Sequence, residues 1–213
     1  MKIGIFGGSF NPPHKMHEDM AKFLLDGYVD KIIFVPTGIH YEYKNNLLSN
    51  EHRYNMIKLI TDKYKCMDVS NFEMKEEVVY TYQTLDYFRS LYPTDEIYFV
   101  CGSDNLSYID KWKRGDYLLK EYKYLVIDRN TNRINELLEQ FQEYKTNIIP
   151  VSMELNDLSS TYIRNNVNDK TKLERYLDKD VLKYINENNL YRWCIWEVLI
   201  KLSYLLMIMR SLL

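Results

Sequence analysis

Five short runs of apolar residues recur along the chain, and their rhythm constrains the fold more than any other feature. The runs cover residues 2–6, 31–36, 96–101, 123–128 and 147–151. Apolar residues at helical spacing mark further segments at 15–26, 50–63, 81–91, 132–144 and 178–189. Unbroken apolar runs indicate strands covered on both faces, which is typical of a parallel sheet flanked by helices. The pattern predicts an α/β fold: a Rossmann-like, doubly wound parallel sheet in one domain, with a small helical C-terminal part.

Composition narrows the class of protein. The 213 residues are enough for one globular domain, and the net charge of −2 comes with no basic stripe. That balance argues against a protein that binds nucleic acid by bulk charge. The cysteine count is odd and no C-x-x-C pair occurs, which indicates reduced thiols in a cytoplasmic protein. The first residues also lack the long apolar segment of a signal peptide.

Ligands of such sheets bind beyond the carboxyl ends of the strands, and the first strand is followed there by the stretch GGSFNPPHKMH. Gly7 and Gly8 allow a sharp turn and the close approach of a ligand to the backbone. Two prolines then delay the helix until about His14. A helix start with His14 and His17 on one side suits a triphosphate.

Other readings of this stretch stay open at the level of sequence. The dinucleotide fingerprint G-x-G-x-x-G and the P-loop G-K-[ST] are both absent. Two histidines three residues apart could chelate zinc, although no further ligand pattern completes the set. They could also be a structural pair.

A second candidate anion site follows the last strand, in the stretch LSSTYIR. Polar residues that favour a helix start precede and open it: Asn156, Asp157, Ser159 and Ser160. Ser160 and Thr161 would offer hydroxyl groups, and Arg164 would add a planar guanidinium that suits phosphate oxygens. A capped surface helix with a solvated arginine is the alternative.

Together these motifs resemble those of the H-x-G-H nucleotidyltransferases, and more narrowly the bacterial nicotinate mononucleotide adenylyltransferases. The resemblance runs from Lys2 to about Tyr191. It rests on the order and spacing of IGIFGGSFNPPHKMH, HRYNMIKL, YTYQTLDYF, FVCGSDNLSYIDKW, LVIDR, LSSTYIR and VLKYINENNLY. The resemblance implies transfer of the adenylyl group of ATP to nicotinate mononucleotide, giving deamido-NAD and pyrophosphate.

The resemblance also implies roles for individual residues. ATP would bind along Gly7, Gly8, Ser9, Phe10, Gly102, Asp104, Ser160 and Thr161, with His14, His17 and Arg164 as the catalytic group. Mg²⁺ would be the cofactor, carried by the ATP phosphates rather than by a metal site of the chain. Trp112 and Thr81 would contact the pyridine ring of the mononucleotide. Core packing is the alternative role for Trp112, and a helix cap is the alternative for Thr81.

This sequence departs from the family pattern at four places. Met16 replaces the glycine of H-x-G-H, where it would either crowd ATP or turn into the core. HYEYK replaces P-P-H-K after the second strand, with Lys44 as the candidate substrate-binding lysine. Gln83 replaces an acidic residue, and Asn11 precedes Pro12 where the family has aspartate. These changes leave room for other acceptors, such as nicotinamide mononucleotide or phosphopantetheine, and for an inactive nucleotide-binding scaffold.

The resemblance ends near Tyr191, so we expect a nucleotidyltransferase domain over 1–191 and an apolar extension over 192–213. Residues 193–213 contain no proline or glycine, and a helix is expected. Glu197, Lys201 and Arg210 oppose a membrane crossing. Packing against a second copy of the chain is therefore the favoured role, with membrane contact second and a fortuitous extension third.

Overall fold

The computed structural model describes residues 1–39, 47–128, 133–153 and 158–192. In these residues six strands form one parallel sheet in the order β3-β2-β1-β4-β5-β6. The strands are β1 (Lys2–Gly8), β2 (Lys31–Pro36), β3 (Met67–Val69), β4 (Glu96–Gly102), β5 (Lys123–Ile127) and β6 (Ile148–Val151). The strand order reverses between β1 and β4, which is where ligands bind in doubly wound sheets. The predicted Rossmann-like fold is confirmed.

Side chains of the strands alternate between two cores, so the sheet is covered on both faces as the unbroken apolar runs predict. In β1, for example, Ile3 and Ile5 enter one core and Phe6 enters the other. Tyr124 and Val126 of β5 join the first core in the same way. All of these side chains are buried.

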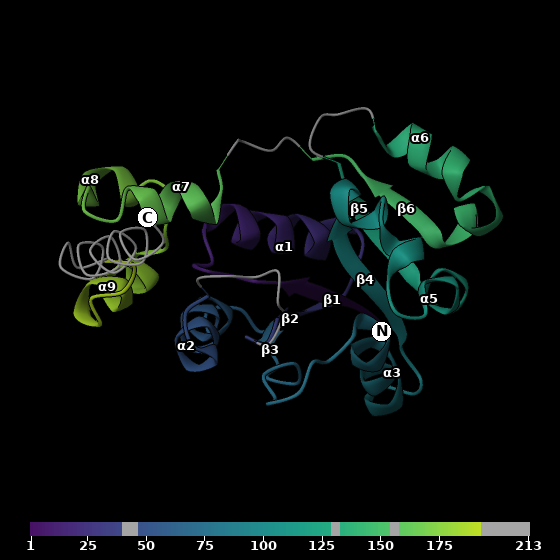
Figure 1. The fold of residues 1–213 in the computed structure, drawn as a ribbon, viewed down its shortest axis with the longest axis horizontal. Helices are drawn as coiled ribbons and strands as arrows, with labels where there is room; N and C mark the ends of the chain where they lie inside the picture. Colours follow the sequence, from purple (N-terminus) through teal and green to yellow (C-terminus); the bar gives the residue numbers. More distant parts are fainter. Residues whose placement is uncertain (40–46, 129–132, 154–157, 193–213) are drawn as a thin grey trace, which may run out of the picture.

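The helices form a layer on each face of the sheet (Figure 1). One layer holds α1 (Lys15–Gly27) and α2 (Asn50–Thr61), which contribute to the second core. The other holds α3 (Thr81–Leu91), α4 (Ser103–Leu106), α5 (Gly115–Glu121) and α6 (Arg133–Gln140). Short 3₁₀ turns occupy Ile109–Lys111 and Gln142–Asn147.

A small group of C-terminal helices extends the fold on one side. It consists of α7 (Ser160–Asn165), α8 (Lys170–Leu173) and α9 (Lys179–Glu187). Met56 and Ile60 of α2 pack with Ile163 of α7 and Val181 of α9 in a third core. We call these helices and the residues up to Tyr191 the C-terminal module; Figure 1 shows it beside α1 and α2.

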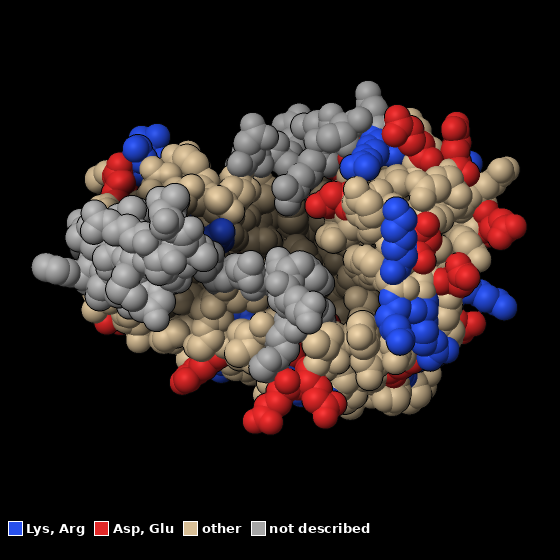
Figure 2. Space-filling view, in the orientation of Figure 1, with Lys and Arg blue, Asp and Glu red and all other residues tan. Residues whose placement is uncertain are grey.

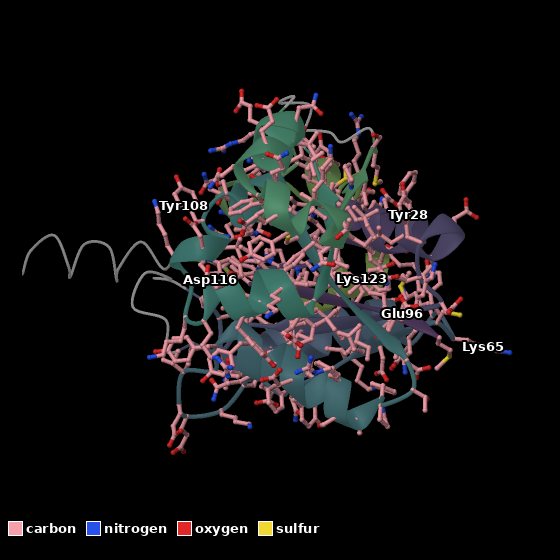
Figure 3. The ribbon with its side chains drawn as sticks, turned by 90° about the vertical axis from the view of Figure 1, so that its right-hand side faces the viewer. Tyr28, Lys65, Glu96, Tyr108, Asp116 and Lys123 are labelled. Atoms are coloured by element: carbon pink, nitrogen blue, oxygen red, sulfur yellow. The ribbon has the colours of Figure 1, made fainter. Side chains whose placement is uncertain are left out.

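The two ends of the strands are distinct in a side view. Glu96 and Lys123 begin β4 and β5, and their side chains form an ion pair of 2.8 Å (Figure 3). Tyr108, which follows the end of β4, lies toward the opposite side of the same view (Figure 3). The predicted ligand motifs belong to the carboxyl end.

Most predicted elements appear near their expected bounds. The three-residue strand β3, the short helices α4, α5 and α8 and the 3₁₀ turn at Ile109–Lys111 were not predicted, and the helical pattern at 132–144 divides into α6 and a 3₁₀ turn. In the part of the chain that the structure describes, no helix has the length and apolar character needed to cross a membrane. Lys44, Asn156, Asp157 and the segment 193–213 lie outside the described residues.

Candidate active site

A cavity of about 190 Å³ lies where β1 and β4 end side by side. Figure 2 shows this face of the molecule hollowed between the C-terminal module and the side that carries α5. Residues predicted to bind ATP or to act in catalysis line the cavity: Gly7, Gly8, Phe10, His14, His17, Gly102 and Asp104. Apolar side chains complete much of the wall: Phe6, Met16, Met20, Cys101, Ile127 and Leu158. The structure thus brings the first and second predicted strand ends together.

The turn after β1 differs in detail from the expectation. The left-handed residue is Phe10, with φ of 46°, and no glycine has a positive φ. Gly8 is needed for space, because a Cβ there would lie 2.9 Å from the ring of Phe10. The buried Phe10 ring packs edge-on against Phe6 and His17, with centroid distances of 5.6 and 5.0 Å. The turn therefore packs against the His17 ring.

The two histidines of the motif hold one another. His14 is the N-cap of α1, as the two preceding prolines predict. Its backbone N–H donates to Nδ1 of His17 at 3.2 Å, and the two ring centroids lie 3.8 Å apart. A nitrogen that accepts a hydrogen bond carries no hydrogen, so the ring hydrogen of His17 is on Nε2. The donor N–H of His17 is thus on the ring nitrogen opposite the His14 backbone, and the residue lines the cavity.

The described residues offer this histidine pair no third metal ligand. Among the residues with a described position, no group of three His, Cys, Asp or Glu could hold a metal ion. A protein zinc site needs three or four ligands, so the described residues alone do not complete the zinc alternative.

Arg164 of α7 reaches the turn after β1. Its Nη1 donates to the backbone oxygen of Asn11 at 2.8 Å, and its Nη2 donates to Oγ1 of Thr161 at 3.0 Å. Ser160 Oγ donates to the backbone oxygen of Pro12 at 2.8 Å. Ser159 caps α7 by accepting the Tyr162 N–H, as its sequence predicts. The third predicted strand end is therefore tied to the first, although Ser160, Thr161 and Arg164 do not line the cavity itself.

Arg53 is a structural residue of the site that the sequence analysis missed. It is fully buried and donates to the backbone oxygens of Ser9 and Leu48, each at 3.0 Å, and to Oδ1 of Asn50 at 2.7 Å. Burial lowers its pKa to about 10, which leaves the guanidinium charged at neutral pH. Arg53 therefore joins Ser9, which is outside the cavity wall, to the segment before α2. Its position one turn before Ile57 on the apolar face of a predicted helix was the available signal.

The loop after β4 is built around Gly102. A Cβ at this position would collide with Oδ1 of Asp104, so the glycine leaves the carboxylate its place beside the cavity. Ser103 Oγ donates to Oδ1 of Asp128 at 2.9 Å, which ties the loop to the end of β5. Burial raises the pKa of the neighbouring Cys101, so its thiol stays neutral.

Two substrate-binding predictions, Thr81 and Trp112, lie away from the cavity wall. Thr81 is the first residue of α3, whose N-cap is Tyr80 rather than Thr81. The half-buried Trp112 packs partly on the first core, edge-on to Phe99 at a centroid distance of 6.2 Å. The segments that carry Trp112 and Thr81 lie close together, because Lys113 Nζ lies 5.8 Å from the ring centroid of Tyr80.

Two of the departures from the family pattern have structural roles. Gln83 accepts a hydrogen bond from the Tyr80 N–H at 2.9 Å, so it caps α3. Met16 is buried in the second core and also forms part of the cavity wall. Of the two alternatives, Met16 turns into the core, and it also narrows the cavity in which ATP is predicted to bind.

Comparison with known proteins agrees with this architecture. Residues 5–166 match the family described as Cytidylyltransferase-like. A probable nicotinate-nucleotide adenylyltransferase of Carboxydothermus hydrogenoformans is 36% identical over 197 residues, covering 90% of this chain and 98% of the relative. A protein of the same description from Endomicrobium trichonymphae is 39% identical over 195 residues, covering 90% of this chain and 99% of the relative.

The solved structure of Plasmodium falciparum nicotinic acid mononucleotide adenylyltransferase complexed with NaAD superposes with a TM-score of 0.75 at 24% identity. The match covers 91% of this chain and 98% of that chain, which shows the shared fold. The identities of the two bacterial relatives extend over nearly their whole length. The chain is therefore a nucleotidyltransferase that belongs to the nicotinate-nucleotide adenylyltransferases, within the Cytidylyltransferase-like family.

Proposed function

We propose that this enzyme transfers the adenylyl group of ATP to the 5′-phosphate of nicotinate mononucleotide, producing deamido-NAD and pyrophosphate in NAD biosynthesis. The observation that carries the proposal is the union of the three predicted strand ends at the β1–β4 junction, where Arg164 is bonded to the turn that bears His14 and His17. The names of the relatives support the acceptor. So do the Plasmodium enzyme's complexes with NaAD and with APC, since both enzymes share one fold.

The chemistry requires little of the protein beyond positioning and charge stabilisation. A phosphate oxygen of the mononucleotide attacks the α-phosphorus of ATP, a new P–O bond forms, and the bond from the α-phosphorus to the bridging oxygen breaks. Pyrophosphate leaves with that electron pair. Because the nucleophile is already an anion, no side chain has to remove a proton. His17 Nε2–H, His14 and the Arg164 guanidinium would stabilise the negative charge that moves onto the leaving group.

Binding of ATP would use the backbone of Gly7, Gly8, Ser9 and Phe10 and the hydroxyls of Ser160 and Thr161. Gly102 and Asp104 would hold the ribose. Mg²⁺ would enter with the triphosphate and neutralise part of its charge, which fits a site whose donors are histidine and arginine groups. Trp112, Thr81 and Lys44 remain the predicted contacts of the mononucleotide. A cytoplasmic location and a homo-oligomer formed through the C-terminal extension are part of the same proposal.

A pyrophosphate-release assay tests the proposal directly. Purified protein with Mg²⁺ and ATP should release pyrophosphate when nicotinate mononucleotide is present, and chromatography should detect the dinucleotide. Parallel reactions contain nicotinamide mononucleotide or phosphopantetheine instead. A higher kcat/KM with either of these would replace the proposed acceptor. ATP binding without turnover on any acceptor would favour the inactive scaffold.

A further inference from the structure

The side chain of Asn11 joins the turn after β1 to the C-terminal module. It is almost fully buried, with 3% of its surface exposed. Its Oδ1 accepts two hydrogen bonds, from the Tyr191 hydroxyl at 3.0 Å and from the Leu48 N–H at 3.2 Å. Its backbone oxygen accepts the bond from Nη1 of Arg164. One residue thus connects Tyr191 to the guanidinium of Arg164.

Tyr191 is itself firmly placed. It is 7% exposed and packs in the third core with α7 and α9. Its backbone is left-handed, with φ of 61°, a conformation that a bulky residue keeps only where its surroundings hold it. Burial raises the pKa of its phenol, so the hydroxyl stays protonated and continues to donate to Asn11.

We propose that Tyr191 is a positioning residue for adenylyl transfer: its hydroxyl fixes the Asn11 amide, and the Asn11 backbone in turn fixes Arg164. The inference rests on the proposed function. Without the hydroxyl, Oδ1 of Asn11 loses one of these two donors, and the link between the turn after β1 and the C-terminal module weakens. The turn that carries the Asn11 carbonyl is then less firmly placed against Arg164, and a misplacement of about 1 Å can cost about 100-fold in rate.

The rest of the junction keeps the fold intact when this bond is lost. Ser160 still donates to Pro12, and the Lys15 N–H still donates to the backbone oxygen of Tyr176 at 2.9 Å. Lys15 Nζ also donates to the backbone oxygen of Glu174 at 2.9 Å. Tyr191→Phe should therefore change the alignment of the site more than the stability of the protein.

Tyr184 provides a matched control in the same module. It lies on α9, packs against the third core, and its hydroxyl is 3.0 Å from Nδ1 of His52 and accepts from Nδ2 of Asn55 at 3.2 Å. None of these partners belongs to the turn after β1. Tyr184→Phe and Tyr191→Phe both remove one hydrogen-bonded hydroxyl, but only the second touches the path to Arg164.

Steady-state kinetics with ATP and nicotinate mononucleotide should separate the variants. Tyr191→Phe should lower kcat/KM for ATP about tenfold, with kcat reduced, while Tyr184→Phe stays close to wild type. Asn11→Ala combined with Tyr191→Phe should lose no more activity than Asn11→Ala alone, because both changes break one path. Equal losses in the two tyrosine variants, or additive losses in the double variant, would overturn the positioning role.

A binding experiment keeps this result separate from the choice of acceptor. Calorimetry with Mg²⁺ and inorganic tripolyphosphate needs no mononucleotide. The proposed reaction fails if the wild type binds tripolyphosphate but turns over no acceptor. The positioning role still stands in that case if Tyr191→Phe binds tripolyphosphate several-fold more weakly than Tyr184→Phe. If Tyr191→Phe matches wild type in tripolyphosphate affinity and in every measured turnover, Tyr191 has no such role.

Discussion

At the scale of single residues, the donors of the site are oriented by backbone atoms. The His14 N–H fixes the Nδ1 side of His17, and the Asn11 carbonyl fixes one edge of Arg164. A ring or guanidinium held on one side presents its other side in a defined direction, which lowers the reorganisation needed during reaction. The substitution of either group is therefore a test of chemistry rather than of packing.

His17→Ala should lower kcat by roughly 100- to 1000-fold, the usual cost of removing one donor from a charge-stabilising site. The melting temperature should change much less, because His17 is only half-buried. The measurement is kcat together with thermal unfolding. His52→Ala is the matched control, since His52 contacts Tyr184 in the C-terminal module and should leave kcat unchanged. Lost stability with unchanged specific activity of the folded fraction would mean that the histidine pair is structural.

At the scale of elements, the sequence predicts what repeated patterns encode. Tyr82, Leu85 and Phe88 recur at helical spacing, and α3 has the bounds 81–91 that this spacing predicts. Met67–Val69 is too short for any pattern to register, and it forms a strand only because β2 offers its edge. Local periodicity therefore does not predict elements that form only through tertiary contacts.

The residues of the candidate site fall into the same two groups: those that stand in local motifs and those that are placed by tertiary contacts. His14, His17, Gly102 and Asp104 stand in local motifs, and the structure brings them to one cavity. The hydrogen bonds that hold the turn beside that cavity come from distant segments. Arg53 donates to Ser9, and Tyr191 donates to Asn11 across 180 positions. A buried arginine or a terminal tyrosine has many possible partners, and one sequence does not choose among them.

The start of α9 gives an element-scale prediction about pH. Asp178 caps the helix by accepting the Asp180 N–H, and Lys63 of the segment after α2 lies 2.6 Å from its carboxylate. Burial alone would raise the pKa of Asp178, but the hydrogen bonds from Lys63 and Asp180 outweigh it and hold the pKa below its ordinary value. Burial alone would lower the pKa of Lys63, whereas its bonds to Asp178 and Asp180 raise it.

The signs of these shifts define when the pair stabilises the fold. The Asp178 contribution is present above the ordinary aspartate pKa of about 4 and is lost as pH falls through the lowered value. The Lys63 contribution is present below about pH 10 and is lost as pH rises through the raised value. Lys63→Met should therefore lower the free energy of unfolding by about 0.5 kcal/mol between pH 5 and 10. The difference from wild type should shrink outside that range.

Urea unfolding at several pH values measures this difference. Lys63→Arg is the control, because it keeps a positive charge beside Asp178 and Asp180. It should retain most of the wild-type pH profile. A difference between Lys63→Met and wild type that stays constant down to pH 2 would show that the ion pair does not stabilise the module.

At the scale of the whole molecule, the sheet and the C-terminal module are joined at the turn after β1. The turn carries the two histidines, and Arg164, Ser160 and Tyr191 of the module all donate hydrogen bonds to it. Figure 1 shows the module beside α1, whose first residue, Lys15, bonds to the backbone of Tyr176. The hydrogen bond from Tyr191 to Asn11 joins the end of this module to the turn after β1.

Two truncations test the roles of the Tyr191–Asn11 bond and of the segment 193–213. Removal of residues 193–213 leaves the Tyr191–Asn11 bond in place and removes none of the predicted ligand motifs, so kcat/KM should stay within about twofold of wild type. Removal of residues 191–213 deletes the bond and should lower kcat/KM at least about tenfold. Because the apolar segment 193–213 is expected to pack on a second copy, both truncations should also lower the mass measured by light scattering. An unchanged mass would reject that interface, and equal activities of the two truncations would reject Tyr191 as the closing contact of the site.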